Sequence, residues 1–145
     1  MNLNNETIKT ILNHRTIRSL KEEPVPTEVF EQLMEVAKRT PTSNGMQSMS
    51  IIHVTDASTR LAISEVCKQP YVAKAPILLI FVVDSYRNAQ IAKENDCHAE
   101  SAADMDRFIQ GFTDGCLAAQ NIVVAAESLG LGTNYFGSVL NDPPR

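Results

Sequence analysis

The sequence predicts one globular domain in which helices alternate with about three strands. Its 145 residues, 43% of them hydrophobic, are enough to bury one sizeable core. Segments with a helical spacing of apolar residues are separated by runs with the composition of strands. Residues 111–129 carry adjacent polar pairs every seven positions on an otherwise apolar background, which predicts a long and mostly buried helix. Because no repeat or interdomain linker interrupts the chain, residues 1–145 are expected to form a single domain.

Two helices are expected in the first 40 residues. Residues 6–13 form a short helix in this interpretation, with Ile8, Ile11 and Leu12 on one face. Two prolines exclude a helix after it, and Thr27 is expected to cap a second helix that ends near residue 39. Its inward-facing residues are Val29, Phe30, Leu33, Met34 and Ala37.

Two strands are expected in the middle of the chain. A loop rich in turn-forming residues, TPTSNGMQSMS, leads into a strand over residues 51–55. Asp56 then caps a helix that carries Leu61, Ile63 and Val66. Residues 76–84, PILLIFVVD, contain seven consecutive apolar residues, which is typical of a fully buried central strand.

The last third begins with a short helix from Ser85 to about Lys93, followed by an acidic stretch that reads as solvated linker and helix start. The long helix 111–129 comes next, and Gly130 supplies the left-handed residue that ends helices. Residues 133–136 have the β-branched and aromatic content of a third strand. The acidic residues are Glu94, Asp96, Glu100, Asp104 and Asp106.

Charge and cysteine content exclude several classes of function. With 13 basic and 17 acidic residues, the net charge is −4 and no basic stripe is visible, so a nucleic-acid or anionic-membrane surface is not expected. Cys67, Cys97 and Cys116 lack CxxC spacing, which argues against a disulfide framework and a zinc site. The apolar run 75–83 is too short to span a bilayer, and the N-terminus has no apolar signal core. A cytoplasmic protein fits best.

The segment His14-Arg15-Thr16-Ile17-Arg18 is the first candidate for chemistry. Two guanidinium groups three residues apart can converge on one anion, and the planar fork of arginine suits a phosphate. Arginines at the C-terminal end of a helix are also common surface residues, because the helix dipole favours them there. From spacing alone, this second explanation is the more frequent one.

A second candidate is the polar loop that contains Ser43 and Gln47. Its amides and hydroxyls can contact the edge of a polar heteroaromatic ring, although an ordinary turn has the same composition. Gln69, followed by Pro70 and Tyr71, is equally ambiguous.

Four segments taken in order carry a more specific signal: HRTIRSLKEEPVP, TPTSNGMQSMSIIHVTD, QPYVAKAPILLIFVVD and AAQNIVVAAESLGLGTNYFGSVLND. Together they closely resemble the flavin-dependent nitroreductase family, in particular its NADPH-dependent nitroreductase/flavin reductase group, over essentially all of the chain. The resemblance implies an α+β fold with a mixed central sheet enclosed by helices. It also implies a homodimer built on the long helix, with FMN in two sites at the dimer interface.

The implied activity is that of an FMN-dependent NAD(P)H oxidoreductase. It would pass a hydride from NADPH or NADH through FMN to nitroaromatic, quinone or flavin acceptors. No catalytic side chain and no metal are expected, because the cofactor carries the chemistry and the protein positions it. The alternative is a flavin-binding or dimerisation module without turnover.

The resemblance assigns ten cofactor-binding residues. The phosphate would be held by His14, Arg15, Thr16 and Arg18; the loop beside the flavin supplies Ser43 and Gln47; Gln69 would contact the ring; and Tyr135, Gly137 and Ser138 would lie along the isoalloxazine. Relatives of this family continue past the position of Arg145 with further sheet, a basic segment and an arm. We therefore expect residues 1–145 to bind FMN more weakly than a chain extended by the family's C-terminal segment, and to turn over NADPH slowly or not at all.

Overall fold

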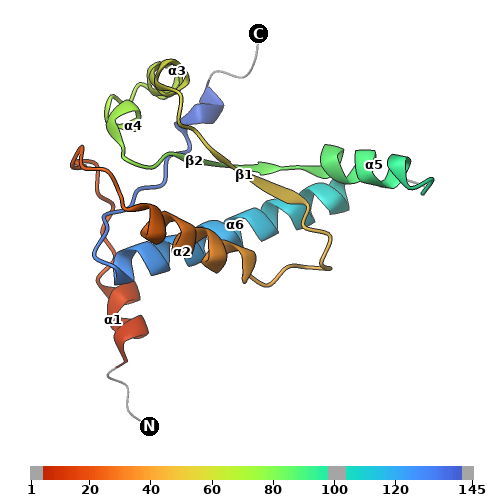
Figure 1. Cartoon of the computed structure of the whole chain (residues 1–145), viewed down its shortest axis with the longest axis horizontal. Helices are drawn as coiled ribbons and strands as arrows, with labels where there is room; N and C mark the ends of the chain where they lie inside the picture. The colour runs from red at the N-terminus through yellow and green to blue at the C-terminus, as the bar shows by residue number, and fades with distance from the viewer. Residues whose placement is uncertain (1–4, 98–103, 142–145) are drawn as a thin grey trace. The chain divides into compact units, whose positions relative to one another are not determined.

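The computed structural model describes residues 5–97 and 104–141, and within them the protein is an α+β fold, as predicted (Figure 1). Helices dominate, and two strands form a small sheet. The elements in order are α1 (Glu6–Leu12), α2 (Thr27–Lys38), β1 (Met49–His53), α3 (Ala57–Cys67), α4 (Tyr71–Lys74), β2 (Leu79–Val83), α5 (Ser85–Glu94), α6 (Met105–Ser128) and the 3-10 turn η2 (Ser138–Asn141).

The chain divides into two compact units. The first unit comprises Met1–Leu33, His53–Leu79 and Val123–Arg145, and the second comprises Met34–Ile52 and Ile80–Ile122. α2, β1, β2 and α6 each contribute residues to both units. None of the described helices is both long enough and apolar enough to cross a membrane.

The two strands pair antiparallel. At one end the amide of Val54 donates to the carbonyl of Leu78 over 3.0 Å, and at the other the amide of Asp84 donates to the carbonyl of Ser48 over 2.9 Å. The expected strands 51–55 and 76–84 therefore exist, with bounds of 49–53 and 79–83. The expected full burial of the second strand is wrong, because β2 is half-buried along its whole length and pairs with a single strand among the described residues.

The expected third strand at residues 133–136 is wrong. Only Thr133 pairs, through an isolated parallel bridge to Thr16 in which the amide of Ile17 donates to the carbonyl of Thr133 over 2.9 Å. Strand propensity is realised only where a neighbouring chain supplies a ladder. Here a neighbour is present at one residue, so the rest of this stretch stays irregular.

α6 begins at Met105, six residues earlier than expected. Its end follows the prediction: Gly130 has φ +79°, and the amides of Gly130 and Leu131 donate to the carbonyls of Glu127 and Ala126, each over 3.0 Å. The expected burial is only partly correct. One face is buried through Ala118, Ala119, Ile122, Val123 and Ala126, whereas Phe108, Phe112 and Leu117 are 51%, 57% and 43% exposed.

The two N-terminal helices differ in burial. The inward face of α2 is confirmed, with Leu33 and Ala37 buried. The helix begins one residue earlier than a Thr27 cap requires, because the carbonyl of Pro26 accepts from the amides of Val29 and Phe30. The short helix expected at residues 6–13 is present as α1, and its Ile8, Ile11 and Leu12 are all exposed.

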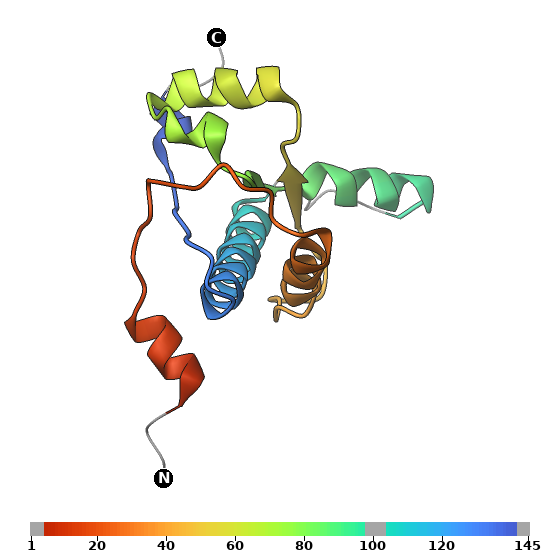
Figure 2. The ribbon, with the colours of Figure 1, turned by 60° about the vertical axis from the view of Figure 1, so that its left-hand side comes forward.

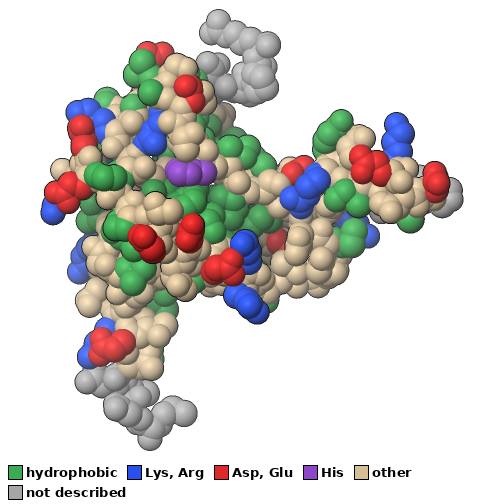
Figure 3. Space-filling view, viewed as in Figure 1, with side chains coloured by type: hydrophobic (Ala, Val, Ile, Leu, Met, Phe, Trp, Pro, Cys, Tyr) green, Lys and Arg blue, Asp and Glu red, His purple; other side chains and the backbone are tan. Residues whose placement is uncertain are grey.

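The helices α3 and α5 are present as predicted, and the predicted cap of α3 by Asp56 is confirmed. Asp84 caps α5 in the same way. The carboxylate of Asp56 accepts from the amide of Thr59 over 2.7 Å, and Asp84 accepts from the amide of Arg87 over 3.1 Å. In the first unit α3 packs against α4 and η2, as the yellow-green, green and blue segments of Figure 2 show. Along α5, exposed hydrophobic side chains alternate with charged ones (Figure 3), Tyr86 and Ile91 among them. Of the acidic stretch between α5 and α6, Glu100 lies outside the described residues.

Candidate functional site

The segment His14–Arg18 is joined to the chain that leaves α6. The bridge between Thr16 and Thr133 brings the two backbones together, and Gly132 makes the close approach possible. A Cβ on Gly132 would lie 3.1 Å from three carbon atoms of Ile17, which is tighter than ordinary van der Waals contact. The polar segment is thus held against the end of a long helix.

A shared carboxylate oxygen strengthens this junction. His14 Nδ1 lies 2.7 Å from Glu127 Oε1, and Thr133 Oγ1 donates to the same oxygen over 2.6 Å. The Glu127 side chain is 12% exposed, whereas that of His14 is 43% exposed. With Nδ1 held by the carboxylate, His14 keeps Nε2 for a second partner.

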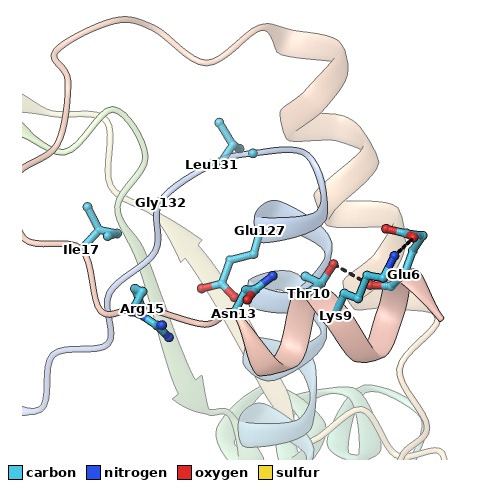
Figure 4. A pocket seen from close by; sticks show the side chains of 10 residues that line it. Glu6, Lys9, Thr10, Asn13, Arg15, Ile17, Glu127, Leu131 and Gly132 are labelled. Atoms are coloured by element: carbon cyan, nitrogen blue, oxygen red, sulfur yellow. Dashed lines mark hydrogen bonds and ion pairs between the residues drawn. The ribbon is translucent and has the colours of Figure 1, made fainter. Parts of the chain in front are cut away.

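Arg15 and Arg18 present cationic groups on the same segment. Arg15 donates from Nη1 to the carbonyl of His14 over 2.7 Å and lines an open cavity of about 420 Å³ between α1 and the end of α6 (Figure 4). Lys9, which also lines it, is paired with Glu6 at 2.7 Å. The exposed guanidinium of Arg18 makes no hydrogen bond or ion pair with a described residue. The remaining lining residues are Thr10, Asn13, Ile17, Glu127, Gly130, Leu131 and Gly132.

A directed chain of side-chain hydrogen bonds links α4 to the last described segment. Asn134 Nδ2 donates to the hydroxyl of Tyr71 over 2.9 Å, and that hydroxyl donates to Gln69 Oε1. Gln69 Nε2 in turn donates to Ser138 Oγ over 2.7 Å. The Ser138 oxygen therefore accepts a hydrogen bond from Gln69, and the Ser138 hydroxyl retains its own proton for another acceptor. Asn134 Oδ1 is buried and has no hydrogen-bond partner among the described residues.

Tyr135 and Gly137 lie in the same segment as Asn134 and Ser138, the two ends of this hydrogen-bond series. Tyr135 is 54% exposed. A Cβ placed on Gly137 would meet no atom within 4 Å. The segment that follows α6 thus combines the exposed ring of Tyr135, the uncrowded backbone of Gly137 and the Ser138 hydroxyl, whose proton can be donated.

Ser43 and Gln47 belong to the second unit. The amide of Ser43 donates to Asp114 Oδ1 over 3.0 Å, and Asp114 on α6 is 2% exposed. Gln47 has φ +48°, and its carbonyl accepts from Arg87. Asn44, in the same loop, donates to Gln110 on α6 over 2.8 Å. The loop is therefore held at several points, while the side chain of Gln47 is exposed.

Eight of the ten predicted residues lie in the first unit, and within it the structure joins Gln69 to Ser138 and pins the segment His14–Arg18 to α6.

Four supporting residues were missed: Glu127, Tyr71, Asp114 and Arg87. Glu127 and Asp114 had a visible signal, because each is a carboxylate on the polar stripe of a mostly apolar helix. Nothing in the sequence pairs Arg87 with the loop forty residues before it.

The fold and these clusters define an α+β protein with an anion-suited segment and a separate polar network around Gln69. The family model described as "Nitroreductase family" matches residues 11–142, so the chain belongs to the nitroreductase family. The resemblance read from its four segments is thereby confirmed.

Individual relatives agree. The chain is 39% identical over 140 residues to a Bacillus subtilis protein named "FMN reductase (NADPH)", covering 95% of this chain and 56% of that protein. It is 35% identical to a Staphylococcus saprophyticus "NADPH-dependent oxidoreductase", with coverages of 92% and 53%. The chain thus spans a little over half the length of the curated relatives it matches.

Solved structures show the same similarity. A nitroreductase from Bacillus subtilis superposes with a TM-score of 0.90 at 39% identity, covering 93% of this chain and 56% of the other. An NADPH:FMN oxidoreductase from Vibrio harveyi, complexed with NAD+, superposes with a TM-score of 0.88 at 33% identity, with coverages of 94% and 58%.

Proposed function

We propose that this protein is an FMN-dependent NAD(P)H oxidoreductase. The observation that carries the proposal is the pinned segment His14–Arg18, whose cationic side chains remain exposed beside a carboxylate-anchored histidine. The names of its relatives, FMN reductase and NADPH-dependent oxidoreductase, supply the class of reaction.

The side chains of this segment fit the phosphate of FMN. Arg15 donates one hydrogen bond to the His14 carbonyl, and its other N–H groups can donate to a ligand. Arg18 donates to none of the described residues, so all of its N–H groups can do so. A phosphate accepts charge-assisted hydrogen bonds from such forks in a bidentate geometry. The backbone bridge at Thr16 fixes the segment before any ligand arrives, which lowers the entropy lost on binding.

The network around Gln69 fits the polar edge of a flavin ring. Ser138 retains a proton that can be donated to a ring carbonyl or nitrogen, and its oxygen is already fixed by Gln69. The orphaned Asn134 Oδ1 shows that this network has one acceptor more than the described residues satisfy. A buried acceptor of this kind calls for a donor from water, from further protein or from a ligand.

FMN, when bound, would accept a hydride from NADPH or NADH and pass electrons to a nitroaromatic, quinone or flavin acceptor. The residues of this chain bind and orient the cofactor. Gln69 and Ser138 would hold the polar edge of the ring, Tyr135 and Gly137 would lie along the isoalloxazine, and Ser43 and Gln47 would belong to the loop beside the flavin. No side chain of this set is assigned as a general acid or base.

We propose further that the protein is a homodimer. The support is the apolar face of α6 in the second unit, where Phe108 and Phe112 stack with ring centroids 6.2 Å apart and both side chains are exposed. A second copy of the same helix would cover such a face with an identical one. Light scattering of the purified chain at micromolar concentration tests this, and a monomer of 16.0 kDa would contradict it.

Two smaller proposals complete the assignment. Residues 1–145 are taken as one nitroreductase-like domain, since four elements contribute to both compact units. We propose a cytoplasmic location, which the free thiols of Cys67, Cys97 and Cys116 support, because free thiols are the usual state in a reducing compartment.

The experiment for the cofactor is a titration with FMN and with riboflavin, which lacks the phosphate. If His14–Arg18 hold the phosphate, FMN should bind at least tenfold more tightly than riboflavin, since charge-assisted hydrogen bonds contribute about 1.5–3 kcal/mol. Equal affinities would remove the phosphate from this segment. A protein that binds neither flavin would favour the alternative of an interaction module.

A further inference from the structure

The first turn of α5 holds the loop that contains Gln47. Arg87 donates from Nη1 to Ser50 Oγ over 2.8 Å and from Nη2 to the carbonyl of Gln47, with Met49 O at 3.4 Å. Asn88, the next residue, donates from Nδ2 to the carbonyl of Met46 over 2.9 Å and to Ser48 Oγ over 3.2 Å. Two consecutive side chains thus bind consecutive carbonyls of the loop.

The loop needs this support because Gln47 has a left-handed backbone. Its φ of +48° is uncommon for a residue with a Cβ, and such conformations persist where surrounding contacts over-determine them. The side chain of Gln47 is exposed, so its own packing does not hold it there. Hydrogen bonds from Arg87 and Asn88 fix the peptides on either side of Gln47.

Arg87 is itself oriented by Asp84 and Ser50. The Ser50 hydroxyl donates to Asp84 Oδ2 over 2.5 Å, and Asp84 Oδ2 lies 3.9 Å from Arg87 Nη1. Asp84 Oδ1 also accepts the amide of Arg87. The hydrogen bond from Ser50, followed by that of the Arg87 amide, lowers the pKa of Asp84. The Asp84 carboxylate and the Ser50 hydroxyl thus fix the Arg87 guanidinium, and its Nη2 donates to the Gln47 carbonyl.

We propose that Arg87 and Asn88 are positioning residues that hold the Gln47 side chain in the orientation in which it contacts the flavin. The proposal rests on the proposed FMN function. Neither residue touches the cofactor in this account, and both act through the backbone of the loop.

Arginine is suited to this position by its geometry. Two nitrogens of one planar fork reach a hydroxyl and a carbonyl at the same time. A lysine offers a single ammonium, which can reach one of them. Arg87→Lys should therefore keep the charge and retain part of the function that Arg87→Ala loses.

The test is a double-mutant cycle in FMN affinity on the 145-residue chain, with Arg87→Ala, Gln47→Ala and the double variant. If Arg87 acts through Gln47, each single change lowers affinity about three- to tenfold, the range for one neutral hydrogen bond. The double variant then binds no more weakly than Gln47→Ala alone. Lys93→Ala, on the exposed side of the same helix, removes an equal charge and should change affinity less than twofold.

A second readout needs no flavin. Amide hydrogen exchange over residues 44–49 of the flavin-free protein should accelerate in Arg87→Ala and in Asn88→Ala, and remain at the parent rate in Lys93→Ala. Should Arg87→Ala fail to fold, Asn88→Ala and Arg87→Lys carry the same comparison.

The outcomes separate the two proposals. Additive losses in the cycle, or unchanged exchange in the loop, would overturn the positioning role while FMN binding stands. A parent chain that binds no FMN would contradict the proposed function and the flavin contact of Gln47 with it, and the exchange rates would still show whether Arg87 fixes the loop.

Discussion

Glu127 Oε1 lies 2.7 Å from Nδ1 of His14, although 113 residues separate the two in the chain. This contact fastens the cationic segment to the last turn of α6, where Thr133 donates to the same oxygen. A carboxylate on a histidine nitrogen fixes the orientation of the imidazole, in the way that such partners orient the ligating histidines of metal sites. In this protein it orients His14 next to two arginines.

Glu127→Ala should destabilise the flavin-free protein by about 1–3 kcal/mol, because the change leaves the half-buried Thr133 hydroxyl without its acceptor and frees His14. Urea unfolding followed by circular dichroism measures this. The control is Glu65→Ala on the exposed side of α3, for which less than about 0.5 kcal/mol is expected. Similar losses in the two variants would mean that the His14 contact does not hold the segment.

Arg18→Ala should weaken FMN binding by about 1.5–3 kcal/mol, the range for hydrogen bonds to a charged group. Stability without flavin should hardly change, because the side chain is exposed and makes no bond to a described residue. Arg39→Ala, which removes an exposed arginine at the end of α2, controls for net charge. If Arg18→Ala binds FMN as tightly as the control does, this arginine belongs to the solvated surface.

Gly111 and Gly115 should respond oppositely to alanine. A Cβ on Gly111 would lie 2.5 Å from the carbonyl oxygen of Ser48 and 2.9 Å from Val83 Cγ1, so Gly111→Ala should cost more than about 1 kcal/mol. At Gly115 a Cβ meets nothing within 4 Å, and alanine should stabilise the helix by up to about 1 kcal/mol. Thermal unfolding of both variants decides the matter. A stabilised Gly111→Ala would show that α6 does not approach the loop this closely.

The cap of α3 should contribute stability that depends on pH. Hydrogen bonds from Ser58 and then Thr59 lower the pKa of Asp56 from 3.8 to about 2. Because the folded pKa is depressed, the contribution is complete above about pH 4 and is lost as the pH falls towards 2. The Tm difference between the parent and Asp56→Ala should therefore be constant at neutral pH and close between pH 4 and 2. Glu31→Ala, which removes an exposed carboxylate from α2, is the control variant for this comparison.

Local signals predicted a large part of the fold. Asp56 and Gly130 marked a helix start and a helix end because capping depends on residues within a few positions of one another. The apolar run before Asp84 predicted β2 for a similar reason. Long-range features were not predictable in this way. The strand expected at residues 133–136 needed a neighbour along its whole length, and among the described residues it has one only at Thr133.

The same difference between local and long-range features applies to the candidate site. Its residues could be proposed only through the resemblance of the four segments to the family. Composition and spacing alone favoured surface arginines and an ordinary turn. The supporting residues were not predicted. Glu127, Tyr71 and Arg87 act on residues 113, 63 and 40 positions away, respectively, and no local pattern records such pairings.

The proposed function requires that residues 1–145 hold FMN in a form that NADPH can reduce. The direct measurement is to load the purified chain with FMN, remove unbound flavin, and follow the visible flavin absorbance after anaerobic mixing with NADPH, with free FMN at the same concentration as the control. We expect the bound flavin to bleach faster than free FMN, at a rate that saturates with NADPH concentration. Absorbance that stays constant in the presence of both NADPH and NADH, or a protein that remains colourless after incubation with FMN, would contradict the proposed function.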